Sequence, residues 1–170
     1  MKNKVTVIGA GLAGCEAAHT LSRLGVGVDL IEMKPNRKTP AHKSDNFGEL
    51  VCSNSLKASR IDSAAGLLKE EMRRFGSVCL DAAEISSVAA GGALAVDRDI
   101  FSKFITEKIK NDPNINIINQ VVTKLPETQV TIIATGPLTD GGLAEEIARI
   151  TGSDNLNFFD AGLLLLQKKV

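Results

Sequence analysis

A glycine motif between two patterned segments constrains the fold of this chain more than any other feature. Val5 to Ile8 is a β-branched run typical of a buried parallel strand, and GxGxxG follows it at residues 9–14. Residues 12–24 then carry apolar side chains at helical spacing, and Gly25 stands where a helix ends. A second strand is predicted over residues 26–31. Strand, helix and strand within about 30 residues predict a βαβ unit and a parallel sheet.

The chemistry of a dinucleotide explains the spacing of this motif. The first glycine allows a tight turn, the second lets the backbone approach a pyrophosphate, and the third lets helix and strand pack closely. Free N–H groups and the positive end of the helix dipole then bind the phosphates. Glu32 stands 18 residues after Gly14, near the position where an acid accepts hydrogen bonds from the adenosine ribose. An acid favours an unphosphorylated ribose, so FAD or NAD is expected rather than NADP.

A second segment helps to choose between FAD and NAD. Residues 130–136 read VTIIATG, a hydrophobic strand ending in Ala-Thr-Gly, which is similar to the second fingerprint of flavoproteins with two dinucleotide-binding domains. The alternative is a core strand that ends in an ordinary turn. We favour FAD on the order of the two motifs. The predicted cofactor-binding residues are Gly9, Ala10, Gly11, Leu12, Ala13, Gly14, Glu32, Ala134, Thr135 and Gly136.

Composition argues against several classes of protein. The 170 residues have a formal net charge of zero, so no overall attraction draws the chain to nucleic acid or to an anionic membrane. Without Trp or Tyr, an aromatic platform for stacking bases is not expected. The three cysteines form no CxxC pair, which predicts neither a disulfide framework nor a metal site. Reduced thiols and a cytoplasmic location are expected, with no membrane partner.

Cys52 is the candidate catalytic residue. It lies in VCSNS, residues 51–55, within a polar stretch from residue 34 to residue 62 that lacks periodicity. Cations in this stretch would lower the pKa of the thiol if they came close, whereas the alternative is a small buried hydrophobe. Cys15 and Cys79 are expected to pack in the core, although the dipole of the first helix would favour a Cys15 thiolate.

The same polar stretch contains a basic cluster, interpreted as a solvated loop or as a contact for a phosphate backbone or an anionic cofactor. Its members are Lys34, Arg37, Lys38, His42 and Lys43. Further helices are predicted over residues 64–75, with Leu67, Leu68 and Met72 on one side, from a cap at Asp97 to Ile109, and over residues 143–150. Strands are predicted over residues 115–118 and 130–133.

Taken together, these segments resemble the N-terminal part of the folate- and FAD-dependent tRNA (uracil-5-)-methyltransferase family. GxGxxG is shared by many flavoproteins, including the one that modifies the tRNA wobble uridine, whereas VCSNS is not expected in that protein. The combination of ELVCSNSL and AGGALAVDR is specific. The matching segments are residues 7–18 (VIGAGLAGCEAA), 39–41, 49–56 (ELVCSNSL), 67–74 (LLKEEMRR), 90–98 (AGGALAVDR) and 133–139 (IATGPLT).

The resemblance implies a reductive methylation of the T-loop uridine of tRNA at carbon five. Methylenetetrahydrofolate would supply the carbon, and NAD(P)H would reduce the FAD. Uracil carbon five is a poor nucleophile until a thiolate adds to the neighbouring carbon, and the one-carbon unit needs protection from water. By its match to the family motif, Cys52 would be one of two cysteines and would hold or relay the methylene beside the flavin.

The expected fold is α/β, a Rossmann-like FAD-binding domain with a parallel sheet, incomplete at its C-terminus. Residues 1–161 would form the N-terminal part of this domain, and residues 162–170 an atypical tail produced by truncation or a frameshift, because family members are longer. Such a chain would be an incomplete enzyme, inactive by itself. Two alternatives stay open: a non-catalytic nucleotide- or partner-binding remnant, and a fragment of an NAD-dependent oxidoreductase.

Overall fold

A four-stranded parallel sheet organises the computed structural model, which describes residues 4–126 and 130–152. The strand order is β6-β2-β1-β7, and all three pairings are parallel. Val7 lies opposite Leu30 on one side and Ile132 on the other. The parallel sheet predicted from the βαβ unit is therefore confirmed. Its strands are β1 (Lys4–Ile8), β2 (Gly27–Glu32), β6 (Ile115–Asn119) and β7 (Thr131–Ile133). The expected tail at residues 162–170 lies outside the described residues.

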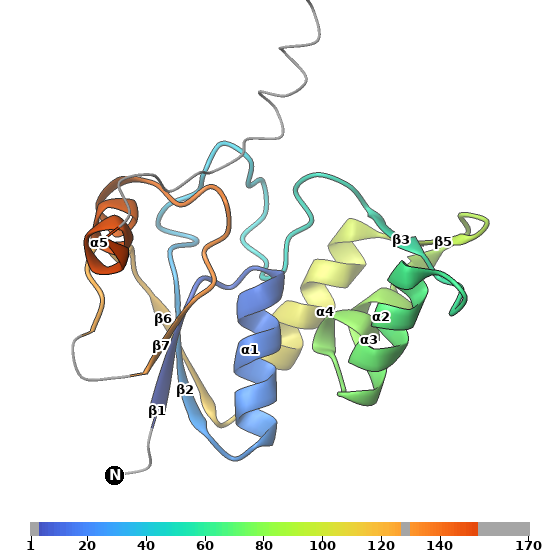
Figure 1. The fold of residues 1–170 in the computed structure, drawn as a ribbon, viewed down its shortest axis with the longest axis horizontal. Coiled ribbons are helices and arrows are strands. Elements are labelled where there is room, and N and C mark those ends of the chain that lie inside the picture. The colour runs from blue at the N-terminus through green and yellow to red at the C-terminus, as the bar shows by residue number, and fades with distance from the viewer. Residues whose placement is uncertain (1–3, 127–129, 153–170) are drawn as a thin grey trace, which may run out of the picture.

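Helices lie on both sides of this sheet. One side is covered by α1 (Leu12–Arg23) and α4 (Arg98–Lys110), whereas α5 (Gly141–Thr151) lies on the other (Figure 1). Asp97 caps α4 as predicted, because its Oδ1 accepts hydrogen bonds of 3.0 Å from the N–H groups of Asp99 and Ile100. The core between sheet and helices contains Val7, Cys15, Val28, Leu30, Phe101, Ile105 and Ile109.

A smaller antiparallel sheet lies beyond α4, with the order β3-β5-β4 (Figure 1). Its first strand falls within the polar stretch at residues 34–62, which is therefore not irregular throughout. No strand was predicted there, because β3 is defined by pairing with distant β5, through Ser55 with Ala95 and Ala58 with Ala93, rather than by local periodicity. This part of the fold contains β3 (Ser55–Ala58), α2 (Ala64–Arg74), α3 (Val78–Ile85), β4 (Ser87–Val88) and β5 (Ala93–Val96).

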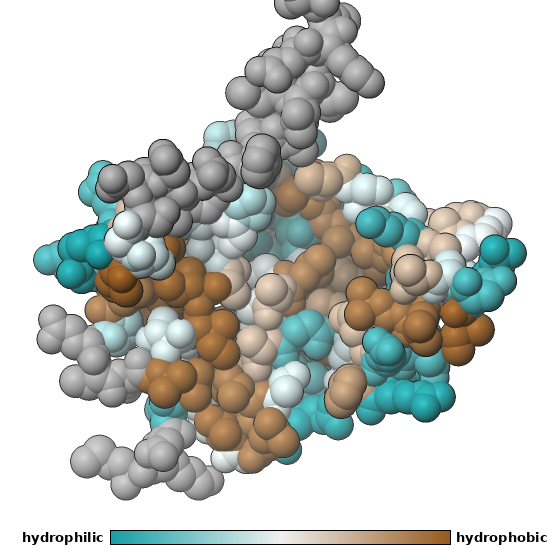
Figure 2. Space-filling model, viewed as in Figure 1, coloured by the Kyte–Doolittle hydropathy of each residue, from teal (hydrophilic) through white to brown (hydrophobic). Residues whose placement is uncertain are grey.

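Helix α2 does not bury the leucine side predicted from its sequence. Leu67 and Leu68 are 49% and 56% exposed, and hydrophobic surface is visible over the region of α2 (Figure 2). Lys69 is buried instead, and its Nζ donates to the carbonyl oxygens of Ala58 and Ala65 at 3.0 and 3.1 Å. A long side chain can bury its stem while its ammonium group binds backbone carbonyls, which attaches α2 to the end of β3.

No helix within residues 4–126 and 130–152 combines the length and apolar character that crossing a bilayer requires. Over the same ranges, no group of three or more His, Cys, Asp or Glu side chains is placed to hold a metal ion.

Candidate functional site

The glycine turn lies at the carboxyl end of β1, where the order of the sheet reverses. β2 and β6 lie on one side of β1 and β7 lies on the other. In open α/β sheets, ligands bind in the crevice at such a switch point. Two backbone hydrogen bonds of 2.8 Å join the three strand ends, from Gly9 N–H to Ile31 and from Ala134 N–H to Ile8.

The three motif glycines have different surroundings. Gly9 has a φ of +98°, and a Cβ there would lie 2.7 Å from the carbonyl oxygen of Ala134. A Cβ at Gly14 would lie 1.7 Å from the carbonyl oxygen of Gly9. A Cβ at Gly11 would meet no atom within 4 Å. Packing therefore requires two of the glycines, whereas the third leaves open space where a pyrophosphate could approach the backbone, so the cradle fits a dinucleotide.

The N-terminus of α1 presents backbone N–H groups at this open space. Its N-cap is Gly11, which offers no side-chain acceptor, and the first turn of this fully described helix holds no acidic residue. The first N–H groups of a helix have no partner within the helix, and its dipole places partial positive charge there. Leu12 and Ala13 are exposed. This end of α1 can therefore bind an anion.

Glu32, the predicted ribose acceptor, lies directly beside the turn. Its Oε2 accepts a hydrogen bond from the N–H of Ala10 at 2.7 Å, and its Oε1 accepts one from the N–H of Lys34 at 2.9 Å. The side chain is buried. Each carboxylate oxygen can accept a second hydrogen bond, so these contacts leave capacity for a ribose hydroxyl.

The Ala-Thr-Gly segment adjoins the glycine turn from the β7 side. Gly136 has a φ of +74°, and its carbonyl oxygen accepts a hydrogen bond of 2.8 Å from the Thr139 hydroxyl. The hydroxyl oxygens of Thr135 and Thr139 are 2.6 Å apart. The structure thus brings all ten predicted cofactor-binding residues to one edge of the sheet.

Cys52 is exposed, in a loop that is anchored to the glycine turn. Gly48 donates from its N–H to the carbonyl oxygen of Ala10 at 2.9 Å, and Phe47 donates to Thr106 Oγ1 at 2.8 Å. Cys52 follows Gly48 by four residues, so their Cα atoms are at most about 14 Å apart. Arg60, one of the cations near it in sequence, pairs with Asp62 at 3.3 Å. The thiol therefore lies on an exposed loop whose start, at Gly48, is bonded to the glycine turn.

Comparison with known proteins identifies the family. The sequence model of the family described as glucose inhibited division protein A matches residues 4–169. The chain belongs to this family. It is similar to the methylenetetrahydrofolate--tRNA-(uracil-5-)-methyltransferase TrmFO of Ligilactobacillus salivarius, with 56% identity over 168 residues, covering 99% of this chain and 38% of the relative. The TrmFO of Staphylococcus aureus is 54% identical over 169 residues, covering 99% of this chain and 39% of the relative.

The chain therefore spans less than two fifths of the length of these relatives. The resemblance predicted from VCSNS and AGGALAVDR is confirmed as a match to their N-terminal part. Among solved structures, GidA of Aquifex aeolicus superposes with a TM-score of 0.65 at 16% identity, covering 87% of this chain and 31% of that one. A likeness at this identity shows the fold, which is the Rossmann-like fold of the family.

The other two cysteines of this chain, Cys15 and Cys79, have a structural role. Cys15 and Cys79 are buried, and their sulfur atoms lie 3.4 and 3.8 Å from the carbonyl oxygens of Ala10 and Leu12. Burial and the charge of Glu32 raise the pKa of Cys15 to about 12, and burial also raises the pKa of Cys79. Core packing is confirmed for both. The thiolate that the helix dipole alone would favour at Cys15 does not form, because desolvation outweighs the dipole.

Ion pairs occupy much of the basic cluster. Arg37 binds both carboxylate oxygens of Asp140 at 2.7 and 2.9 Å, and Lys38 pairs with Asp45 at 2.8 Å. Both cations are part-exposed, as expected for a solvated loop. Lys34 is buried, contrary to that interpretation. The cluster thus serves in part to attach the loop after β2 to the segment before α5.

Sequence reasoning did not foresee the contacts of three residues that join the loop before Cys52 to the glycine turn, although it counted Lys34 in the basic cluster. They are Lys34, Gly48 and Glu49. In the structure Lys34 continues the alternation of buried residues through Leu30 and Glu32, but a lysine at this place gives no signal of burial in the sequence. Gly48 has a φ of +60°, and a Cβ there would lie 2.7 Å from Ile105 Cδ1, so its glycine has a packing reason. Glu49 carried no signal beyond its place in the family motif.

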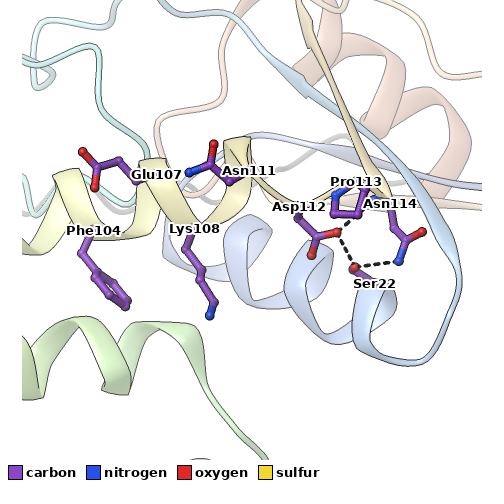
Figure 3. A pocket seen from close by; sticks show the side chains of 8 residues that line it. All are labelled: Ser22, Phe104, Glu107, Lys108, Asn111, Asp112, Pro113 and Asn114. Atoms are coloured by element: carbon purple, nitrogen blue, oxygen red, sulfur yellow. Dashed lines mark hydrogen bonds between the residues drawn. The ribbon is translucent and has the colours of Figure 1, made fainter.

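A surface hollow of about 580 Å³ lies away from this site, at the amino ends of the strands (Figure 3). Ser22, in the last turn of α1, donates to Asp112 Oδ1 at 2.8 Å and accepts a hydrogen bond of 3.3 Å from Asn114, just before β6. Phe104 and Lys108 extend from α4 beside it. Its polar contacts link α1 to the start of β6, so we assign it a structural role.

Proposed function

We propose that this chain binds FAD at the glycine turn and represents the flavin-binding part of a folate-dependent tRNA (uracil-5-)-methyltransferase. One observation carries the proposal. Gly11 opens onto space at the switch point of the sheet, whereas Gly9 and Gly14 are required by packing. Membership of the family and 56% identity to a TrmFO protein support the choice of reaction.

The residues have distinct proposed roles in binding. The N–H groups of Leu12 and Ala13 would hold the diphosphate at the start of α1. Glu32 would accept hydrogen bonds from the adenosine ribose. Residues 134–136 would line the part of the crevice beside β7. A bound flavin would supply the reducing equivalents that convert a methylene into a methyl group.

Cys52 would hold or relay the one-carbon unit in this scheme. Its thiol is exposed on a loop tied to the glycine turn, so a substrate can reach it. As a nucleophile it would lose its proton to solvent before bonding to carbon. Methylenetetrahydrofolate would be the carbon donor, NAD(P)H the reductant and a tRNA uridine the acceptor, in the cytoplasm.

Titration with FAD tests the cofactor assignment. We expect a bound-flavin visible spectrum after gel filtration, and tighter binding of FAD than of NAD in calorimetry. Gly11→Val should abolish FAD binding, because its side chain would fill the open space. Gly92→Val is the matched control, since a Cβ there also meets nothing within 4 Å and Gly92 lies in the smaller sheet region. Tighter binding of NAD would instead support the oxidoreductase alternative.

Methylation of tRNA tests the reaction. Residues 1–152 would replace the matching segment of the Ligilactobacillus salivarius relative, and transfer of label from methylenetetrahydrofolate to tRNA would be measured. We expect activity in the chimera, loss of activity in its Cys52→Ala variant, and retention in its Ser53→Ala variant. Full activity of Cys52→Ala would refute the role of this thiol. Turnover by the 170-residue chain alone would exclude the non-catalytic alternative.

A further inference from the structure

A closed circuit of contacts joins the glycine turn to the loop that carries Cys52. Ala10 donates from its N–H to Glu32, and the other oxygen of Glu32 accepts from the N–H of Lys34. The Lys34 ammonium faces Glu49, and the neighbour of Glu49, Gly48, donates back to the carbonyl oxygen of Ala10. Within this circuit, the contact between Lys34 and Glu49 is the link made by two charged side chains.

The ammonium group of Lys34 is buried and makes its contacts within the protein. Its side chain is 4% exposed, its Nζ donates to the carbonyl oxygen of Asn46, and Nζ lies 3.8 Å from Glu49 Oε2. A buried ammonium group is costly unless it is paired and hydrogen-bonded. Both of its partners, Asn46 and Glu49, belong to the loop that leads to Cys52. Its burial is thus compensated only while this loop stays in place.

Glu49 shapes the loop from the other side. Its Oε1 accepts hydrogen bonds from the N–H groups of Lys43 and Ser44 at 2.9 and 3.1 Å. Its Oε2 is buried and accepts no hydrogen bond from the described part of the chain, and Lys34 Nζ lies 3.8 Å from it. Burial raises the pKa of Glu49, but the two hydrogen bonds and the charges of Lys34 and His42 outweigh it and lower this pKa overall.

We infer that Lys34 is a positioning residue, which holds residues 43–50 against the glycine turn through Glu49 and Asn46 and so sets where the Cys52 thiol stands relative to the bound dinucleotide. The inference rests on the proposed function, because it assigns the relationship between Cys52 and the cofactor. Cys52 follows Glu49 by three residues, so a backbone shift at Glu49 would carry over to Cys52. Lys34 itself needs no contact with substrate.

Hydrogen exchange of the FAD-free protein tests the circuit independently of the cofactor. In Lys34→Met, the amides of Lys43, Ser44 and Gly48 should exchange at least about tenfold faster than in wild type, because a buried carboxylate has lost its cation. Amides of β1 and β2 should be unchanged. Lys38→Met is the matched control, since Lys38 lies in the same loop and its contacts, an ion pair with Asp45 and a 3.4 Å hydrogen bond to the carbonyl oxygen of Lys43, are exposed and contribute little. Unchanged exchange in Lys34→Met would overturn the inference.

Alkylation of Cys52 by iodoacetamide tests the consequence for the thiol. Saturating FAD should slow the reaction of wild type and Lys38→Met by about fivefold or more, because the loop then stands over the filled crevice. Lys34→Met, also saturated with FAD, should lose most of this protection. A merely structural role would lower FAD affinity without changing protection at saturation, so full protection in Lys34→Met would reject the positioning role.

The two arms separate failure of the inference from failure of the proposed function. If wild type binds no FAD, the proposed function fails, and hydrogen exchange still decides whether Lys34 holds the loop. If Lys34→Met loses protection in β1 and β2 as well, it has unfolded, and Glu49→Gln replaces it. That variant keeps a carbonyl acceptor for the loop amides but removes the charge facing Lys34. Normal exchange and normal thiol protection in Glu49→Gln would then count against the inference.

Discussion

Ala10 and Gly48 are joined by a backbone hydrogen bond of 2.9 Å, which connects the turn after β1 to the loop that carries Cys52. The N–H of Ala10 is bound at the same time by Glu32. Both backbone polar groups of Ala10 are therefore engaged, the N–H by Glu32 at the end of β2 and the carbonyl oxygen by Gly48 in the loop that leads to Cys52. The glycine turn and the loop that leads to Cys52 are consequently joined directly through Ala10.

Two alanine substitutions in the glycine motif should affect different properties, one the free energy of unfolding and the other the affinity for FAD. Gly14→Ala should lower the free energy of unfolding by about 3 kcal/mol or more, because the methyl group would overlap the Gly9 carbonyl oxygen. Gly11→Ala should change it by at most about 1 kcal/mol, since its Cβ meets nothing, yet should weaken FAD binding. Urea unfolding and FAD titration measure the two properties. Equal destabilisation by both variants would contradict this account of the turn.

The loop that leads to Cys52 is anchored on α4 by the hydrogen bond from Phe47 to Thr106, and substitution of Thr106 tests this anchor. Thr106→Val should cost about 1 to 3 kcal/mol of unfolding free energy, because the buried N–H of Phe47 loses its acceptor while side-chain volume is kept. Thr106→Ser keeps the hydroxyl group and should cost less. Urea unfolding measures the difference. A cost for Thr106→Val no larger than that for Thr106→Ser would show that the hydrogen bond to Phe47 is not what anchors the loop.

Much of the parallel sheet and its glycine turn could be predicted because their signals are local. A β-branched run, a spaced glycine motif and an acid at the end of the next strand each reflect a physical requirement within a few residues. The caps at Asp97 and Gly25 are local in the same way. The juxtaposition of Gly9 with Ala134 followed from the order of two fingerprints, and the structure confirms it.

The smaller sheet and the buried ion pair could not be predicted, because distant segments define them. β3 is held by β5, and the side of α2 that is buried depends on a bond from Lys69 to Ala58 rather than on the leucines. Lys34 reads as one of several solvated cations until Glu49 and Asn46 are folded against it. Burial of a charge is a property of tertiary structure, so composition gave no sign of it.

Glu32 should affect both stability and cofactor affinity. Glu32→Ala leaves the N–H groups of Ala10 and Lys34 without their acceptor, which should cost about 1 to 3 kcal/mol for each buried group. Glu32→Gln keeps one carbonyl oxygen and should cost less, but its amide donor would still weaken FAD binding. Calorimetric FAD titration beside urea unfolding separates the effects. An unchanged FAD affinity in Glu32→Gln would argue against a ribose contact.

The buried thiol of Cys15 should make the free energy of unfolding fall as the pH becomes alkaline. Unfolded, this thiol deprotonates near its ordinary value of 9.0, whereas burial and the charge of Glu32 raise its folded pKa to about 12. The unfolded state therefore binds fewer protons between these values, and the stability present below 9.0 is lost as pH rises. Each pH unit in this window should remove up to about 1.4 kcal/mol of unfolding free energy through Cys15.

Urea unfolding between about pH 8 and about pH 10 measures this slope. Cys15→Ala should flatten it relative to wild type, because the variant has no thiol to deprotonate on unfolding, whereas lysine titration contributes equally to both proteins. Cys52→Ala is the matched control for removing a thiol outside the core. The chain contains no tyrosine, so no phenol adds to the slope in this range. If the free energy of unfolding falls equally with pH in wild type and in Cys15→Ala, deprotonation of Cys15 does not contribute to the slope, and the prediction is wrong.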